Sequence, residues 1–339
     1  FWGLNMVRWK EVLEEAYRSA YEYRMDYGES LSLRGLFYIL VSKNVIPNTV
    51  NAYKSLSRVT ARARYRGEFP WYLIRDTTRQ YWYMEPLESY PSEPLSEEEL
   101  KKWLEERIKS YTNVSINPWE DQPYRIIVVV EKEALGALVR SFIEQVWEYG
   151  VYQVCVTRGY DSATDIRRIT EAINSISEDQ TPVILQAGDF DPSGEDIVRD
   201  FRDRIKMLSE REDIIFEKVA VTADQILDLK LPARPESAEE IRKIQRDPRY
   251  QKYVEKLRSD PRLAPLVERY GGLVRVELDA LVALKPEDFK QILRNALSRY
   301  FDENIYREKT LPKMEELKEK ADEYRRKSFE NLRKLLEGG

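Results

Sequence analysis

Histidine is absent from the 339 residues, and cysteine occurs once. Without histidine the chain cannot contain a Ser-His-Asp triad, a histidine general base or a histidine-ligated zinc site. Cys155 cannot form an intrachain disulfide, and its apolar surroundings at 151–156 favour a buried structural thiol. A single cysteine agrees with a reducing compartment, so we expect a cytoplasmic, intracellular protein.

Long apolar runs are lacking as well. No stretch of about 18 apolar residues occurs, so the sequence predicts no membrane span. Hydrophobic residues make up 42% and charged residues 34%, which allows packed cores beneath a surface rich in ion pairs. The length predicts two domains of ordinary size. Without histidine and with one cysteine, a metal site must use carboxylates, which favours Mg²⁺ or Mn²⁺.

The formal net charge of −5 argues by itself against nucleic-acid binding, but basic residues are concentrated in one segment. Between residues 54 and 79, seven basic residues and only two acidic residues occur, with aromatic residues interleaved. This pattern predicts a surface that follows a phosphate backbone, the alternative being a solvated helix face above core aromatics. The residues expected to contact DNA are Arg58, Arg62, Arg64, Arg66 and Arg75.

The first part of the chain has the pattern of three helices and a short strand pair. Apolar spacing predicts helices over 8–27 and 32–43, the second with Ser32 as its N-cap. Thr49 can cap a third helix that runs to about residue 65, and β-like residues follow. This order predicts a winged helix-turn-helix domain over 1–84, with the third helix as the recognition helix.

A proline-containing linker with one charged helix is expected over 85–124, and strands then alternate with helices. The expected strands are 126–130, 151–157, 182–187 and 216–221, and the expected helices are 133–149, 164–177 and 194–209. Alternation of this kind predicts a parallel sheet. Further along we expect a charged helical insertion at 234–262, a strand at 276–281, and a C-terminal helix within 301–339 that packs or dimerises.

Three carboxylates follow two of these strands. Asp189 and Asp191 lie one residue apart just past 182–187, and Glu131 follows 126–130. The carboxyl ends of parallel strands meet at one edge of a sheet, and like charges so close together need a cation between them. The pattern predicts a Mg²⁺ site held by these three residues, the alternative being solvated carboxylates at strand ends.

Several strings together resemble the Toprim domain of the topoisomerase VI A subunit and of its meiotic double-strand-break relatives. Residues 130–134, 157–160 and 189–194 are similar to that family's first acidic motif, glycine turn and metal motif, and 277–281 is close to a late acidic motif. Residues 34–38, Arg-Gly-Leu-Phe-Tyr, occupy the place of a family string that ends in the nucleophilic tyrosine. The string departs from the family at its second residue, Gly35, where an acidic residue is usual.

The resemblance implies an α/β Toprim domain over 125–300, a mainly parallel sheet with helices on both faces, preceded by an α-rich winged-helix domain. It implies that Tyr38 is the nucleophile, that Arg34 steadies the phenolate or the phosphate, and that Mg²⁺ is the cofactor. It also implies double-stranded DNA as substrate, a homodimer in which one protomer's tyrosine meets the other's metal, and a possible GHKL-type ATPase subunit. The expected activity is that of an ATP-hydrolysing type II DNA topoisomerase, A-subunit-like, which cleaves and rejoins strands through a phosphotyrosyl intermediate.

Two other functions remain open at this point. A Toprim nuclease would hydrolyse DNA with metal-activated water and would not use Tyr38. A non-catalytic DNA-binding protein of a mobile element or replicon would keep the fold without the turnover. A Tyr38→Phe variant separates the first two functions, since only the topoisomerase reaction needs the phenol.

Overall fold

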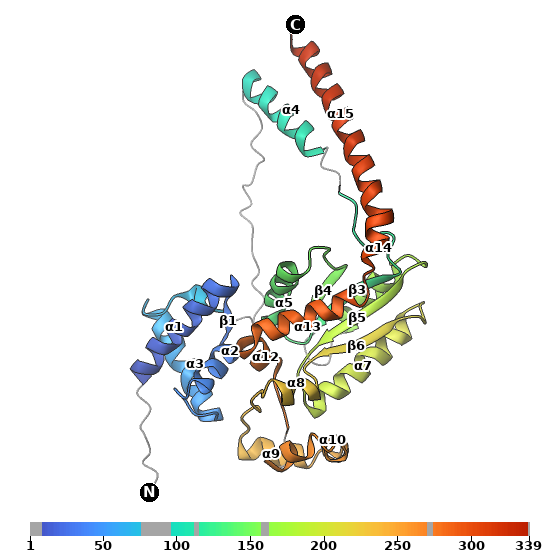
Figure 1. The fold of residues 1–339 in the computed structure, drawn as a ribbon. Helices are drawn as coiled ribbons and strands as arrows, with labels where there is room; N and C mark the ends of the chain where they lie inside the picture. The colour runs from blue at the N-terminus through green and yellow to red at the C-terminus, as the bar shows by residue number, and fades with distance from the viewer. Residues whose placement is uncertain (1–8, 76–95, 112–114, 157–162, 270–273, 338–339) are drawn as a thin grey trace. The chain divides into compact units, whose positions relative to one another are not determined.

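The computed structural model describes residues 9–75, 96–111, 115–156, 163–269 and 274–337, and these form a mixed α/β structure with many helices. The chain divides into two compact units (Figure 1). The first combines residues 1–79 with 124–300, and the second combines 80–123 with 301–339. The segments predicted as separate winged-helix and metal-binding domains therefore belong to the same unit. None of the helices in the described ranges combines the length and the apolar character that crossing a bilayer requires.

Three helices at the start of the first unit pack on one another: α1 (Trp9–Tyr27), α2 (Leu33–Ser42) and α3 (Val50–Tyr65). Ser32 and Thr49 are the N-caps of α2 and α3, and each side chain accepts a backbone N–H from the first turn. The predicted helices and both predicted caps are confirmed, because apolar spacing and cap chemistry are local signals.

The short strand pair is arranged differently from the expectation. Strand β1 (Leu31–Ser32) precedes α2, and β2 (Ile74–Arg75) follows a 3-10 turn, η1 (Trp71–Leu73). The two strands pair in parallel, so they do not form a hairpin after the third helix. Residues 76–95, which include most of the expected linker prolines, lie outside the described residues.

The central sheet of the first unit has four parallel strands in the order β4-β3-β5-β6. In chain order these are β3 (Tyr124–Val130), β4 (Gln153–Val156), β5 (Thr181–Ala187) and β6 (Ile215–Ala220). The predicted strands and the parallel arrangement are confirmed. Because β3 and β5 are the inner strands, the residues that follow them meet near the middle of the sheet edge.

Helices cover both faces of this sheet (Figure 1). On one face, α6 (Ala163–Asn174) and α7 (Pro192–Leu208) share an isoleucine-rich core with β3 and β5. On the other face, α5 (Glu133–Val146) packs on β3 and β4, and α13 (Pro286–Ser298) packs on α5 and β6. The free Cys155 on β4 is half-buried against the first of these cores, less than the buried position expected, and burial raises the pKa of its thiol to about 11, which disfavours the reactive thiolate.

In the described residues between β6 and α13, the chain forms four short helices and one helix that the sequence did not predict. The short helices are α8 (Ala223–Asp228), α9 (Ala238–Gln245), α10 (Pro248–Ser259) and α11 (Ala264–Arg269). The strand predicted at 276–281 was wrong. Only Val276 pairs with another segment, in an isolated bridge to Phe190, and α12 (Leu278–Leu284) begins two residues later and packs on α2.

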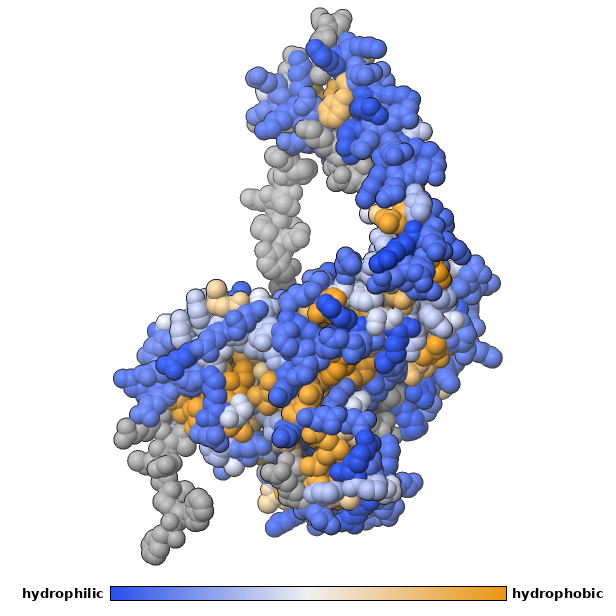
Figure 2. Space-filling view, viewed as in Figure 1, coloured by the Kyte–Doolittle hydropathy of each residue, from blue (hydrophilic) through white to orange (hydrophobic). Residues whose placement is uncertain are grey.

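The second unit is built from α4 (Glu97–Tyr111), α14 (Glu303–Ile305), a π-helical turn η2 (Tyr306–Thr310) and the long α15 (Leu311–Glu337). Helix α4 packs on α15, and the buried Trp119 packs edge-to-face on Phe301. The charged helix expected within 85–124 and the C-terminal helix expected within 301–339 are both present. Figure 2 shows mostly hydrophilic residues over α4 and α15.

Candidate metal centre

Strands β3 and β5 bring Glu131 and Asp189 together at their carboxyl ends. The strand register pairs Val130 with Ala187, so the residues that follow the two strands start side by side. The backbone N–H of Asp189 donates to Oε2 of Glu131 at 2.9 Å. Gly188 permits this contact, because a Cβ atom there would lie 2.5 Å from the same oxygen. The structure thus brings together two of the three carboxylates that the sequence predicts as metal ligands.

The third predicted ligand, Asp191, is buried and held by a guanidinium group. Nη2 of Arg275 lies 2.9 Å from Oδ2 of Asp191, and Nη1 of the same side chain lies 2.7 Å from Oε1 of Glu236. Glu236 also faces Nε of Arg234 at 3.4 Å. Asp191 therefore belongs to a chain of alternating charges and is not a solvated carboxylate at a strand end.

The ammonium group of Lys132 occupies the middle of a group of carboxylates. Its Nζ atom lies 2.9 Å from Oδ2 of Asp189, 2.8 Å from Oδ2 of Asp279 and 3.6 Å from Oε1 of Glu277. Burial by itself lowers the pKa of Lys132, but the three carboxylates more than reverse this, and the pKa is raised. Lys132 therefore remains charged and neutralises part of the excess negative charge at the end of β5.

Glu277 and Asp279 enter this group from the first turn of α12. Glu277 is the N-cap residue, and both side chains are buried. The backbone N–H of Leu278 donates to Oδ1 of Asp189 at 2.8 Å, which fixes the start of the helix against β5. The sequence predicted a strand here because Glu277 and Asp279 are two residues apart, the spacing of side chains on one face of a strand. In the structure they are instead the cap residue and the second helical residue of α12, which also face the same side.

Helix α2 reaches the same carboxylates from the N-terminal helices. The hydroxyl of Tyr38 donates to Oε2 of Glu277 at 2.8 Å, and Nε of Arg34 lies 3.0 Å from that oxygen. The N-cap hydroxyl of Ser32 donates to Oδ1 of Asp279 at 2.5 Å. Both residues predicted as catalytic therefore lie beside the carboxylate group of their own chain. The expected approach of a partner protomer's tyrosine stays a prediction.

Tyr38 is fully buried in this arrangement. Burial, followed by the negative charge of Glu277, raises the pKa of Tyr38 well above its usual value, and Arg34 offsets this only in part. The phenol is thus a neutral hydrogen-bond donor here. Any reaction of its oxygen with a substrate requires α2 to move away from α12.

Gly35, where the resembled family has an acidic residue, lies at the contact between α2 and α12. A Cβ atom at this position would lie 3.2 Å from Cβ of Ala283 and 3.2 Å from Cδ2 of Leu31. These distances are tighter than ordinary van der Waals contacts, so the two helices approach closely because residue 35 has no side chain. A carboxylate could not be accommodated here without separating α2 from α12.

Glu131 is the carboxylate of the group for which the described residues show no ion pair. Among the described residues, no lysine or arginine nitrogen forms an ion pair with it, whereas Asp189, Asp191, Glu236, Glu277 and Asp279 each have one. Burial, and next the charge of Asp189, raises the pKa of Glu131 to about 7, against a slight lowering by the charge of Lys132. A divalent cation would relieve both effects, so the donor set fits hard Mg²⁺ or Mn²⁺. In the described part of the chain, however, no three acidic side chains are already arranged as metal ligands.

The predicted DNA-contacting arginines have different surroundings. Arg58, Arg62 and Arg66 are exposed on α3 or at its end. Arg64 is buried, and its guanidinium lies 5.2 Å from the centre of the Trp71 ring, so it packs inside the chain instead of being exposed on α3, and its expected DNA contact stays a prediction. Arg75 is half-buried and forms an ion pair with Glu29 at 2.7 Å. The helical spacing that exposes Arg58 and Arg62 turns Arg64 inward.

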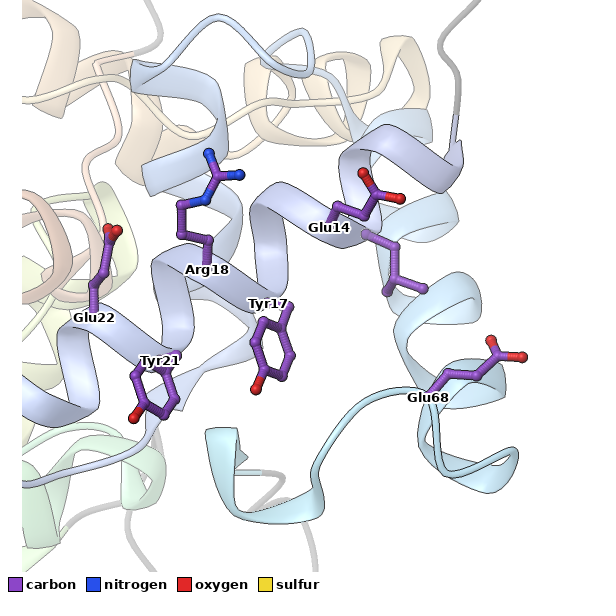
Figure 3. Close-up of a pocket in the computed structure, with 7 residues that line it drawn as sticks. Glu14, Tyr17, Arg18, Tyr21, Glu22 and Glu68 are labelled. Carbon is purple, nitrogen blue, oxygen red and sulfur yellow. The ribbon is translucent and has the colours of Figure 1, made fainter.

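A separate cavity of about 630 Å³ lies along α1 and shares no residue with the carboxylate group (Figure 3). Figure 3 shows the rings of Tyr17 and Tyr21 on one side of α1 and the side chains of Arg18 and Glu22 on another. Three of its lining residues are glutamates: Glu14, Glu22 and Glu68. An acidic lining is unsuited to a phosphate group, so we assign this cavity no part in nucleic-acid chemistry.

Sequence reasoning missed several residues of the group. Lys132 lies within the string at 130–134, and its place directly after a predicted ligand was the available signal. Glu277 and Asp279 were noted as an acidic motif without a role. Arg275 gave no local signal, because both of its partners, Asp191 and Glu236, are distant in sequence. Arg234 pairs with the nearby Glu236, but its link to Glu277 is also long-range.

Comparisons of this chain with protein-family models, with curated proteins and with solved structures return no match.

Proposed function

We propose that this chain cleaves and rejoins DNA strands in a Mg²⁺-dependent reaction of the topoisomerase VI A type, with a Toprim-like metal centre and a winged-helix-like DNA-binding segment. The observation that carries the proposal is the position of Tyr38: its hydroxyl contacts Glu277, and Lys132 links Glu277 to Asp189. A nucleophile candidate on α2 and a carboxylate centre thus lie together where strands β3 and β5 of the four-stranded parallel sheet end.

Glu131, Asp189 and Asp191 would hold the metal. Mg²⁺ at this place would neutralise charge on the scissile phosphate and on the departing oxygen. The residues of the chain prepare the site in two ways. Glu131 forms no ion pair with a described lysine or arginine, and Gly188 lets its carboxylate reach the backbone of Asp189.

Tyr38, Glu277 and Arg34 would carry the covalent step. The phenol oxygen of Tyr38 would form the bond to phosphorus while the bond from phosphorus to a sugar oxygen breaks, and the departing oxygen would take a proton from water. The phenol proton would pass to Glu277, which the hydroxyl contacts in the closed arrangement, before α2 moves away from α12. Arg34 would stabilise the phosphotyrosyl group as a charge-assisted donor, and reversal of the step would reseal the strand.

A reaction of this type would involve two partners, a second copy of this chain and an ATPase subunit. A homodimer would supply two nucleophiles for the two strands of double-stranded DNA, since a two-fold axis repeats each site once. A GHKL-type ATPase subunit would couple ATP hydrolysis to strand passage in a reaction of this type. Neither partner contributes to the contacts described above.

The burial of Tyr38 favours a second candidate, a metal-dependent nuclease. In that reaction the carboxylates act with a metal-activated water, and Tyr38 only connects α2 to α12. A DNA-binding protein without turnover is the third candidate, because Lys132 and Arg275 already pair with two of the three predicted ligands.

Incubation with supercoiled plasmid in Mg²⁺ or in EDTA, followed by denaturation and protease treatment, separates the three. We expect Mg²⁺-dependent cleavage with protein covalently attached to DNA, loss of both cleavage and adduct in Tyr38→Phe, and loss of both in Asp189→Asn. Cleavage without adduct, retained in Tyr38→Phe, would establish the nuclease. Firm DNA binding without cleavage, alone or with an ATPase partner, would establish the non-catalytic protein.

A further inference from the structure

Three large aromatic side chains are exposed at the end of α3 and in the turn that follows it. The exposed fractions are 81% for Tyr65, 57% for Trp71 and 54% for Tyr72. Rings of this size are usually buried in large part when no partner is required. We call these three residues the aromatic platform.

Contacts within the chain hold the aromatic platform in place. The rings of Tyr65 and Trp71 contact each other edge-to-face, with centres 5.4 Å apart, and the guanidinium of the buried Arg64 lies against Trp71. The backbone oxygen of Tyr72 accepts a hydrogen bond from Ser30 at 2.5 Å. The rings of Tyr65 and Trp71 and the backbone of Tyr72 are therefore held by contacts within the chain before any ligand arrives, which lowers the entropic cost of binding.

Exposed basic residues line the face of α3 that ends at the aromatic platform. The sequence of α3 contains no acidic residue, although the whole chain has a net charge of −5. Lys54, Arg58 and Arg62 are exposed at helical spacing on the same face as Tyr65, opposite the buried Leu56 and Ala63. Arg66 adds a further exposed charge next to Tyr65. This face provides a row of phosphate contacts that ends at open aromatic rings.

We propose that α3 and the aromatic platform bind single-stranded DNA, with phosphates along the basic face and unpaired bases stacked on Tyr65 and Trp71. Duplex DNA cannot use the platform in this way, because its base faces are covered by their neighbours, whereas an unpaired strand exposes them. The proposal rests on the proposed function only in taking DNA as the ligand. It adds that the enzyme holds a locally unpaired strand.

Fluorescence anisotropy with two labelled probes tests this: oligodeoxythymidine of about 15 nucleotides and a duplex of equal length. The full chain is compared with the double variant Tyr65→Ala/Trp71→Ala, with Trp71→Phe, and with Tyr324→Ala as a matched control, since the exposed fraction of Tyr324 on α15, 64%, lies between those of Trp71 and Tyr65. We expect the double variant to bind the single strand about 10-fold more weakly or worse and the duplex within about twofold of the unaltered chain. Trp71→Phe and Tyr324→Ala should retain single-strand binding.

A charge variant completes the design. Arg58→Glu/Arg62→Glu should weaken both probes and reduce the dependence of binding on salt, because phosphate contacts do not distinguish paired from unpaired strands. The proposal is overturned if the platform variant binds the single strand as the unaltered chain does, if both probes weaken equally, or if neither probe binds. Plasmid cleavage and adduct formation are scored separately, so failure of the proposed reaction is distinguishable from failure of the platform.

Discussion

The phenol of Tyr38 and the carboxylate of Glu277 are joined by a buried hydrogen bond of 2.8 Å across 239 residues of sequence. Arg34 shares the accepting oxygen, so α2 carries a donor and a cation to one atom of α12. This contact connects the N-terminal helices to the edge of the sheet where the carboxylates meet.

Replacement of Tyr38 by phenylalanine should destabilise the fold by about 1–2 kcal/mol, because the ring stays buried while a hydrogen bond to a charged acceptor is lost. Urea denaturation measures this as a lower midpoint with an unchanged slope. Tyr324→Phe, on an exposed side chain, should leave the midpoint unaltered. An unchanged midpoint for Tyr38→Phe would show that the bond to Glu277 adds no net stability.

The raised pKa of Glu131 should make the free energy of unfolding depend on pH. Burial and the neighbouring Asp189 raise its folded pKa to about 7, above its unfolded value, so the folded state binds more protons between these two values. The metal-free protein should therefore lose stability as pH rises from about 4.5 to 7, by about 1–3 kcal/mol. In Glu131→Gln this component should vanish. Urea denaturation midpoints in EDTA at several pH values, compared between the unaltered chain and Glu131→Gln, measure this loss. Identical pH profiles in the two proteins would contradict a contribution from Glu131.

Lys132 and a divalent cation should compete for the same negative charge. Lys132→Met leaves Asp189 and Asp279 without their shared partner, so the metal-free variant should be less stable by about 3 kcal/mol or more. Added Mg²⁺ or Mn²⁺ should then raise its melting temperature more than that of the unaltered chain. The matched control is Lys313→Met on α15, which removes an exposed lysine from an ion pair with Asp121. A smaller metal-induced shift in Lys132→Met than in the unaltered chain would contradict a shared site.

Gly188→Ala should displace the carboxylate of Glu131, because the new methyl group would occupy the space next to Oε2. The backbone N–H of Asp189 then loses its acceptor, at a cost of about 1–3 kcal/mol. Isothermal titration with Mn²⁺ should show weaker binding than in the unaltered chain. Gly67→Ala provides a control in which nothing lies within 4 Å of the added Cβ, although its positive φ of 74° carries its own strain.

The alternation of strands and helices and the meeting of Glu131 with Asp189 were predictable, because both follow from local patterns and from the geometry of parallel strands. The caps at Ser32 and Thr49 were predictable for the same reason. The helix at 278–284 was not, because Glu277 and Asp279 face inward only through ion pairs with Lys132 and Arg34, which lie more than a hundred residues away. The burial of the Arg64 side chain depends on how α3 packs against its neighbours. The positions of basic residues in the sequence do not reveal that packing.

The near-contact between position 35 and Ala283 has an evolutionary corollary. Two helices that meet across a missing side chain can stay together only while the sum of the two residue volumes remains small. In homologues, a larger side chain at position 35 should therefore accompany a smaller one at position 283, and the reverse. Where position 35 carries a carboxylate, the tyrosine that corresponds to Tyr38 should be exposed to solvent instead of buried against Glu277.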